Sequence, residues 1–171
     1  MKVSDLSQTE FSAYFERYLA QVAGIDLLVA LETGLASMQS FFKAIPEDKL
    51  EFRYAEGKWT PKDILLHLID CERVFCYRAL QFARAENVSL SGFDENEFAD
   101  NSNANTRSRE NLLDEYAAVR KASLLLFRSF NDETLLRTGK SSNNVLSVRA
   151  AGFIIAGHEK HHCQIITERY L

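Results

Sequence analysis

Proline occurs only twice in these 171 residues, at Pro46 and Pro61, and glycine only seven times. Proline is the residue that most strongly interrupts a helix, so its scarcity leaves long stretches in which a helix can run unbroken. Both prolines also stand at expected helix boundaries, since Pro46 follows a long apolar-periodic stretch and Pro61 follows Thr60, a good helix cap. The sequence therefore predicts an all-α fold with long helices, and no segment predicts a strand.

Apolar residues recur three and four positions apart, which places them on one face of a helix. In the first long segment these residues are Leu28, Leu31, Leu35, Met38 and Phe42. Thr60 and Asp63 flank Pro61 in the order of a reciprocal helix cap, and Ser147 is a further cap candidate. We predict one domain over residues 1–171, with a short helix followed by four main helices, at about 9–22, 25–44, 60–85, 108–130 and 147–169.

The charge and the cysteines argue against several classes of protein. The formal net charge is -4, and no basic stripe is present that would bind a nucleic acid or an anionic membrane. The N-terminal stretch MKVSDLSQTEF is polar where a secretory signal would be apolar. Cys71, Cys76 and Cys163 are odd in number and form no CxxC pair, which fits a reducing compartment. We expect a cytoplasmic protein that binds neither nucleic acid nor membranes.

Three of the four histidines lie close together in the stretch GHEKHH. His158 and His162 are four residues apart, so they share one face of a helix, within an apolar stripe that includes Ile154, Ile155, Ile165 and Ile166. His67 lies in the apolar stripe of the helix expected over 60–85. Because all three face inward, they are predicted to meet and to hold a metal ion, since three imidazoles are the protein ligands of one type of catalytic zinc site.

A shared site restricts how the helices connect. His67 lies near the start of its helix, whereas His158 and His162 lie in the second half of theirs, so the two helices must be antiparallel. A simple up-down-up-down bundle would make them parallel. The polar segment 86–107 can carry the chain back along the bundle as a structureless loop, and a loop of this length is often functional. We predict a four-helix bundle of up-down-down-up order, with a long crossover between the second and third main helices.

Two stretches, KWTPKDILLHLIDCERVFCYRALQFAR and AAGFIIAGHEKHHCQIITERYL, together resemble the DinB/YfiT-like family of metal-dependent enzymes. The resemblance covers about residues 14–171 and implies a four-helix bundle with the same crossover. It also implies a divalent metal ion held by His67, His158 and His162, and often a homodimer. Some members of the family are thiol-dependent S-transferases, so the resemblance implies a small-molecule substrate that includes, for some members, a low-molecular-weight thiol.

The ligand set has alternatives. The three histidines could instead be core residues that are satisfied by hydrogen bonds. His161 is expected at the flank of its helix, in a supporting or surface role. Cys71, one turn beyond His67, could be a fourth ligand, a reactive thiol or a packing residue.

Two carboxylates are candidates for proton transfer. Asp70 could orient an imidazole or accept a proton, or it could be an exposed helix charge. Glu159 is the second candidate, although one residue of helix turns it about 100° away from His158. On the same helix as Asp70, Arg73 and Arg78 could bind an anionic substrate or form solvated ion pairs.

The segment from His158 to His162 also fits the HExxH pattern of zinc peptidases, in which the glutamate is the general base. Those enzymes take a third ligand from further along the chain, but no histidine follows His162. The sequence also predicts no strand that would align a peptide substrate. We interpret the pattern as a coincidence of helical spacing.

A dication held by three neutral imidazoles has open coordination positions and can activate water or a thiol. These two chemistries predict a hydrolase or a thiol S-transferase. A non-catalytic, stress-related metal-binding protein is the alternative, in which Cys71 would close the ligand shell. Imidazole ligands suit several metals, and we expect zinc first and nickel second.

Overall fold

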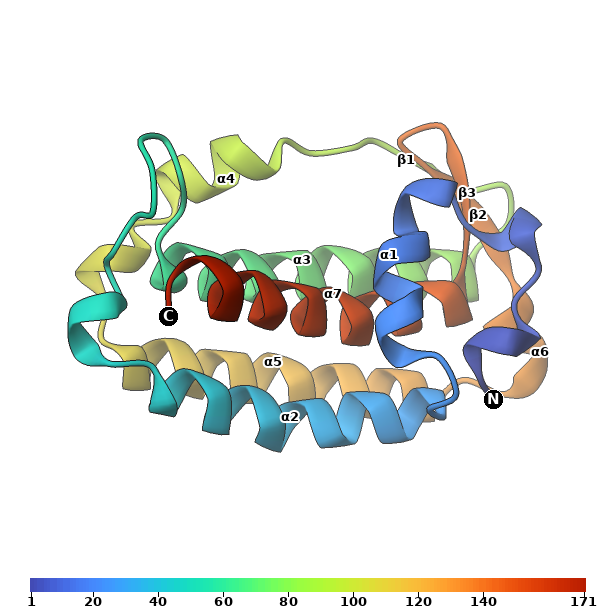
Figure 1. Cartoon of the computed structure of the whole chain (residues 1–171). Helices are drawn as coiled ribbons and strands as arrows, with labels where there is room; N and C mark the ends of the chain where they lie inside the picture. The colour runs from blue at the N-terminus through green and yellow to red at the C-terminus, as the bar shows by residue number, and fades with distance from the viewer.

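The computed structural model describes all 171 residues. Four long helices form a bundle, namely α2 (Leu27–Ala44), α3 (Pro61–Arg84), α5 (Arg109–Arg128) and α7 (Val148–Arg169). Figure 1 shows that α3 and α5 run in one direction and that α2 and α7 run in the other. The predicted four-helix bundle of up-down-down-up order is therefore confirmed, and α3 and α7 are antiparallel neighbours.

The starts of α3 and α7 are fixed by side chains that bind free backbone N–H groups. Thr60 Oγ1 accepts a hydrogen bond from the Asp63 N–H at 3.0 Å, and the Asp63 carboxylate accepts one from the Thr60 N–H at 2.9 Å. Ser147 Oγ accepts a hydrogen bond from the Ala150 N–H at 3.1 Å. Caps of this kind are each worth about 1 kcal/mol. They also set the level in the bundle at which the histidines of each helix lie.

The apolar core is divided into two parts. One part lies toward the start of α7 and includes Phe75, Phe82, Phe127 and Phe153. The other lies toward the end of α7 and includes Phe42, Leu65, Tyr116 and Ile166. The side chains that come between them along the helices are buried and polar, and they are His67, Glu72, Arg120, His158 and Glu159. We call these five residues the polar layer.

Arg120 is the centre of the polar layer and is only 1% exposed. Its guanidinium donates hydrogen bonds to both carboxylate oxygens of Glu72 on α3, at 2.8 and 2.9 Å, and to Glu159 Oε2 on α7, at 2.7 Å. It also donates to the Leu31 carbonyl of α2, at 3.1 Å. The Tyr116 hydroxyl donates to Glu159 Oε2 at 2.8 Å. One residue of α5 therefore binds all three of the other main helices.

The expectation that no segment forms a strand is wrong for three short segments, β1 (Ser89–Leu90), β2 (Thr138–Ser141) and β3 (Asn144–Ser147). β2 and β3 form an antiparallel hairpin, and β1 pairs in parallel with β2. Ser142 and Asn143 have φ values of 51° and 62°, as a type I′ hairpin turn requires. Strands this short offer too few alternating positions for periodicity to reveal them.

Two connecting segments also differ from expectation. The crossover is not structureless, because it contains β1, the helix α4 (Glu95–Asn101) and a 3-10 turn at Ala104–Thr106. The helix expected over 9–22 is interrupted, because Phe11 is extended and a new helical stretch begins at Ala13 and includes α1 (Glu16–Leu19). No single helix is long and apolar enough to cross a membrane, and only the bent pair Ala13–Val22 and Leu27–Ala44 passes that test jointly.

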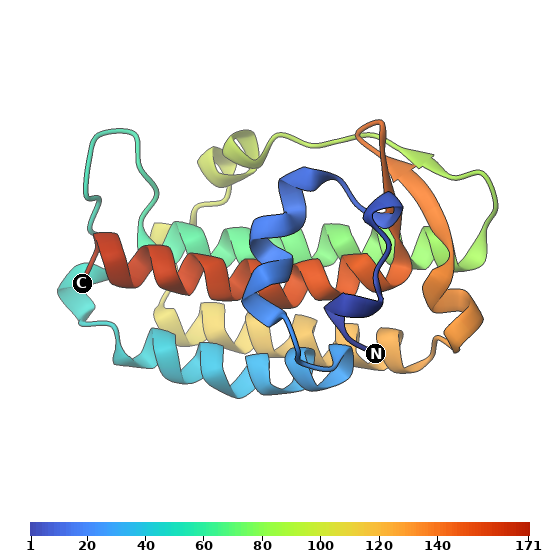
Figure 2. The ribbon, with the colours of Figure 1, turned by 45° about the vertical axis from the view of Figure 1, so that its right-hand side comes forward.

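α1 crosses α7 at Gly157, as Figure 2 shows for the two helices. A β-carbon on Gly157 would overlap with the carbonyl oxygen of Tyr18, so the absence of a side chain permits backbone contact between the helices. This contact places the Tyr18 ring against His158, with ring centroids 4.9 Å apart. The glycine that precedes His158 therefore helps to enclose it.

We expect Gly157→Ala to lower the free energy of unfolding by about 1–3 kcal/mol, because the added methyl group forces two backbones apart in a packed contact. Urea unfolding at neutral pH measures the change. Gln164→Ala, at an exposed position of the same helix, is the control and should change stability by less than about 0.5 kcal/mol. Equal stability of Gly157→Ala and the wild type would show that the backbone of α1 is not in close contact with α7 at this glycine.

Candidate metal centre

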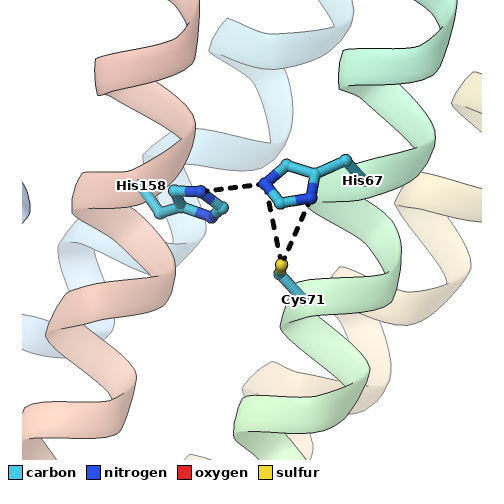
Figure 3. A group of neighbouring side chains, drawn as sticks. All are labelled: His67, Cys71 and His158. Carbon is cyan, nitrogen blue, oxygen red and sulfur yellow. Dashed lines mark hydrogen bonds between the residues drawn. The ribbon is translucent and has the colours of Figure 1, made fainter. Parts of the chain in front are cut away.

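His67 of α3 and the pair His158 and His162 of α7 converge between the two helices. His158 Nε2 lies 3.2 Å from His67 Nε2 and 2.9 Å from His162 Nε2. Figure 3 shows His67 and His158 pointing toward each other from facing helices, with Cys71 on the same helix as His67. The structure thus brings together the three histidines singled out in the sequence.

Hydrogen bonds alone satisfy these imidazoles poorly. Each ring nitrogen has one in-plane position, which carries either a proton or a lone pair. His158 Nε2 must use that one position for two neighbours, and His162 Nδ1 is buried without any hydrogen-bond partner. A cation would instead accept one lone pair from each ring, and two nitrogens bound to one zinc ion at about 2.0–2.1 Å lie roughly 3–3.5 Å apart. The residues present therefore fit a divalent ion.

Burial keeps the three imidazoles neutral. Loss of hydration lowers the pKa of His67 to about 4. Burial, followed by the neighbouring histidines, lowers the pKa of His162 to about 3. The pKa of His158 is lowered by burial and further by His162 and His67. At neutral pH each ring therefore has a free lone pair, which is the form that binds a metal.

Cys71 is a buried thiol beside His67. Its Sγ lies 3.6 Å from Nδ1 and 3.7 Å from Nε2 of His67, so it favours neither ring nitrogen. Cys71, His67 and His158 also form a group whose ligand atoms all lie within 4.8 Å of one another, which could hold a metal ion. Burial raises the pKa of the Cys71 thiol far above its usual range. Two ligand sets therefore share His67 and His158 and differ in the third ligand, which is Cys71 or His162.

The structure gives the two candidate carboxylates different surroundings. Asp70 is half-buried and accepts a hydrogen bond from Arg73 at 3.3 Å, and it contacts no imidazole by hydrogen bonding. Glu159 is 2% exposed, and its oxygens are bound by Arg120 and Tyr116, so it belongs to the polar layer. His161 is half-buried and lies against the Tyr18 and His162 rings, but its ring nitrogens form no hydrogen bond with the other imidazoles.

Sequence reasoning missed a cavity of about 220 Å³ that opens onto His158 and Cys71. Its walls come from the N-terminal segment, α3, the crossover and the hairpin, and they include Phe15, Tyr18, Phe75, Arg78 and Phe93. Its assembly from segments far apart in the chain left no local signal. Sequence reasoning also missed Arg120, although helical spacing places this residue in the inward stripe of α5 with Tyr116 and Leu124.

Comparison with protein families identifies the class of this chain. Residues 30–166 match the model of the DinB superfamily. This span contains all three histidines and the four main helices, except for the first residues of α2 and the last residues of α7. The chain therefore belongs to the DinB superfamily. No curated protein matches its sequence.

Two solved structures share the fold. YfiT from Bacillus subtilis, described as a probable metal-dependent hydrolase with an unusual four-helix bundle topology, is 19% identical with a TM-score of 0.75, over 83% of this chain and 82% of YfiT. A mycothiol-dependent maleylpyruvate isomerase is 11% identical with a TM-score of 0.67, over 96% of this chain. This chain spans 62% of the length of that isomerase. The two likenesses establish the YfiT-like bundle as the fold.

Proposed function

We propose that His67, His158 and His162 hold one divalent ion, zinc or nickel, and that the protein is a metal-dependent enzyme acting on a small molecule. The observation that carries the proposal is the approach of the His67 and His162 imidazoles to within 3.2 Å of His158 Nε2, with no hydrogen-bond arrangement that satisfies all three rings. The description of YfiT as metal-dependent supports it. The proposed reaction is thiol-dependent S-transfer or hydrolysis.

The protonation states favour His162 over Cys71 as the third ligand. His162 carries a lone pair at neutral pH, whereas the buried Cys71 thiol must first lose a proton. His162 Nε2 is also in direct contact with His158 Nε2, while Cys71 Sγ is aligned with neither nitrogen of His67. Cys71 then lies beside the metal ion as a neutral thiol.

An ion held by three neutral imidazoles would supply a Lewis acid with free positions for a water molecule or a thiol. The chain itself encloses the site. The cavity opens onto His158, and Tyr18 and Phe75 form part of its wall, with the Tyr18 ring packed against His158. A nucleophilic sulfur would come from a second small molecule, for which the cavity of about 220 Å³ beside His158 has room. This arrangement suits a low-molecular-weight thiol.

Cobalt(II) loading tests the ligand set, because a thiolate bound to cobalt absorbs strongly in the near ultraviolet and an imidazole does not. We expect the loaded wild type to show no thiolate band and Cys71→Ser to bind an equal amount of cobalt with the same spectrum. Added mercaptoethanol should then produce the band by occupying an open position. A band in the resting protein that Cys71→Ser removes would replace the three-histidine site with a closed shell, as in a non-catalytic metal-binding protein.

A further inference from the structure

Three arginines are buried in this protein, and only one of them lacks a carboxylate partner. Arg120 lies between two glutamates, and Arg149 binds Glu10. The third, Arg78 of α3, is 6% exposed and makes no ion pair and no hydrogen bond through its side chain. Its nitrogens still reach solvent, since His162 Nδ1 is the only fully buried side-chain nitrogen or oxygen without a hydrogen-bond partner, so the guanidinium is free to bind a partner from outside the chain.

The Arg78 side chain faces the cavity that opens onto His158 and Cys71. Its guanidinium carbon lies 5.0 Å from the centroid of the Phe75 ring, which is one turn closer to the histidines, and 5.7 Å from that of Phe93. The side chain therefore folds back along α3 toward the candidate metal centre. Arg78 and Cys71 are about 10 Å apart along the helix, and the folded-back side chain shortens that span.

One acidic residue, Glu95, also lines the cavity, but it forms no ion pair with Arg78. Partial burial raises the pKa of Glu95, and the nearby charges of Arg17 and Arg78 oppose that shift through space. Glu95 as a whole residue is exposed, and the remaining polar wall residues are uncharged, namely Ser12, Ser141, Ser142, Asn144 and two tyrosines. Arg78 is thus the one arginine or lysine in the wall of the cavity that opens onto His158, and the Phe75 and Phe93 rings lie beside its guanidinium.

We propose that Arg78 binds the carboxylate of a small organic acid whose reacting end lies at His158. The inference rests on the proposed function of the histidine site and names its substrate class. A guanidinium binds a carboxylate through two parallel hydrogen bonds, and Phe75 and Phe93 suit an apolar body of several carbons between the acid and the reacting atom. The carboxylate belongs either to the thiol or to the molecule that the thiol or water attacks.

The first experiment tests a carboxylate on the thiol. Cobalt-loaded protein is titrated with ω-mercaptohexanoate and with ω-mercaptohexanol, and the thiolate band reports binding of each. We expect the acid to bind about tenfold or more tightly than the alcohol in the wild type, because a charge-assisted pair replaces a neutral contact. In Arg78→Gln the two affinities should become equal, and Arg78→Lys should keep part of the preference.

The second experiment tests a carboxylate on a molecule without a thiol and needs no metal. Phenylbutyrate and phenylbutanol are compared by the thermal shift that each produces in the metal-free protein. We expect phenylbutyrate to stabilise the wild type more than phenylbutanol, and Arg78→Gln to remove the difference. Arg73→Gln is the matched control, because Arg73 is on the same helix but pairs with Asp70 and Glu115 outside the cavity.

The outcomes separate the two proposals. Failure of the protein to bind cobalt would contradict the metal site, while an Arg78-dependent preference for phenylbutyrate would still support the carboxylate site. Cobalt binding without any acid preference in either experiment would overturn the carboxylate proposal alone. Absence of binding by all four probes at millimolar concentration would also overturn it. Circular dichroism of Arg78→Gln and Arg78→Lys checks that both variants remain folded.

Discussion

Arg120→Met is expected to lower the free energy of unfolding by about 3–5 kcal/mol, the usual cost of removing one partner from a buried ion pair. Methionine approximates the volume of the arginine stem, so the loss measures the charge more than the packing. The variant leaves Glu72 and Glu159 in the core, at 3% and 2% exposure, without their common cation. Urea unfolding at neutral pH measures the effect.

The pH dependence of this loss identifies its origin. In Arg120→Met the two unpaired carboxylates should take up protons more readily when folded than when unfolded, because burial disfavours their charge. A folded state that binds more protons gains stability as the pH falls, so the deficit of the variant should shrink from pH 7 toward about pH 5. The triple variant with Glu72→Gln and Glu159→Gln should recover part of the loss. If Arg120→Met lowered the free energy of unfolding by less than about 1 kcal/mol, and by the same amount at every pH, Arg120 would not be the cation that stabilises the two buried glutamates.

His158→Ala is expected to abolish the stabilisation that a divalent metal confers. For the wild type, free metal at about a thousand times its dissociation constant should add about 4 kcal/mol to the free energy of unfolding. His158 contacts both other imidazoles, so its removal takes away the central ligand and leaves only the His67 and His162 rings, whose centroids are 5.1 Å apart, to hold the ion. Thermal unfolding with and without added zinc measures the difference.

His161→Ala is the matched control for this experiment. His161 is on the same helix and contacts the Tyr18 and His162 rings, but its nitrogens do not meet those of the other three imidazoles, so its variant should keep the zinc-dependent stabilisation. If His158→Ala were stabilised by zinc as much as the wild type, the metal would be bound elsewhere.

The fold was largely predictable because its determinants are local. Thr60 and Ser147 are ordinary caps, and apolar spacing located the four main helices. The connection order followed from one long-range condition, that His67 should meet His158 and His162. The short strands and the break at Phe11 were not predictable, because each depends on contacts with distant segments rather than on local periodicity.

The polar layer shows the limit of sequence reasoning at the site. Arg120 lies on the inward stripe of its helix, but Glu159 was expected about 100° away from the inward His158, and sequence alone does not reveal that these two side chains meet Glu72. Their meeting changes the interpretation of Glu159, since a carboxylate bound by Arg120 and Tyr116 holds α7 in place instead of standing free beside His158. Likewise, the sequence offers Arg73 and Arg78 equally for binding an anionic substrate, and only the structure separates them, since Arg73 forms ion pairs and Arg78 lines the cavity.

The central claim is that the three histidines bind a metal, and the most direct test is elemental analysis of protein purified without an affinity tag, together with His67→Ala. His67 is the one ligand supplied by α3, so its loss leaves only the pair on α7. We predict about one equivalent of zinc or nickel in the wild type and little in the variant, with both proteins equally helical. Equal metal content in both, or none in either after reconstitution with zinc and nickel, would contradict the claim.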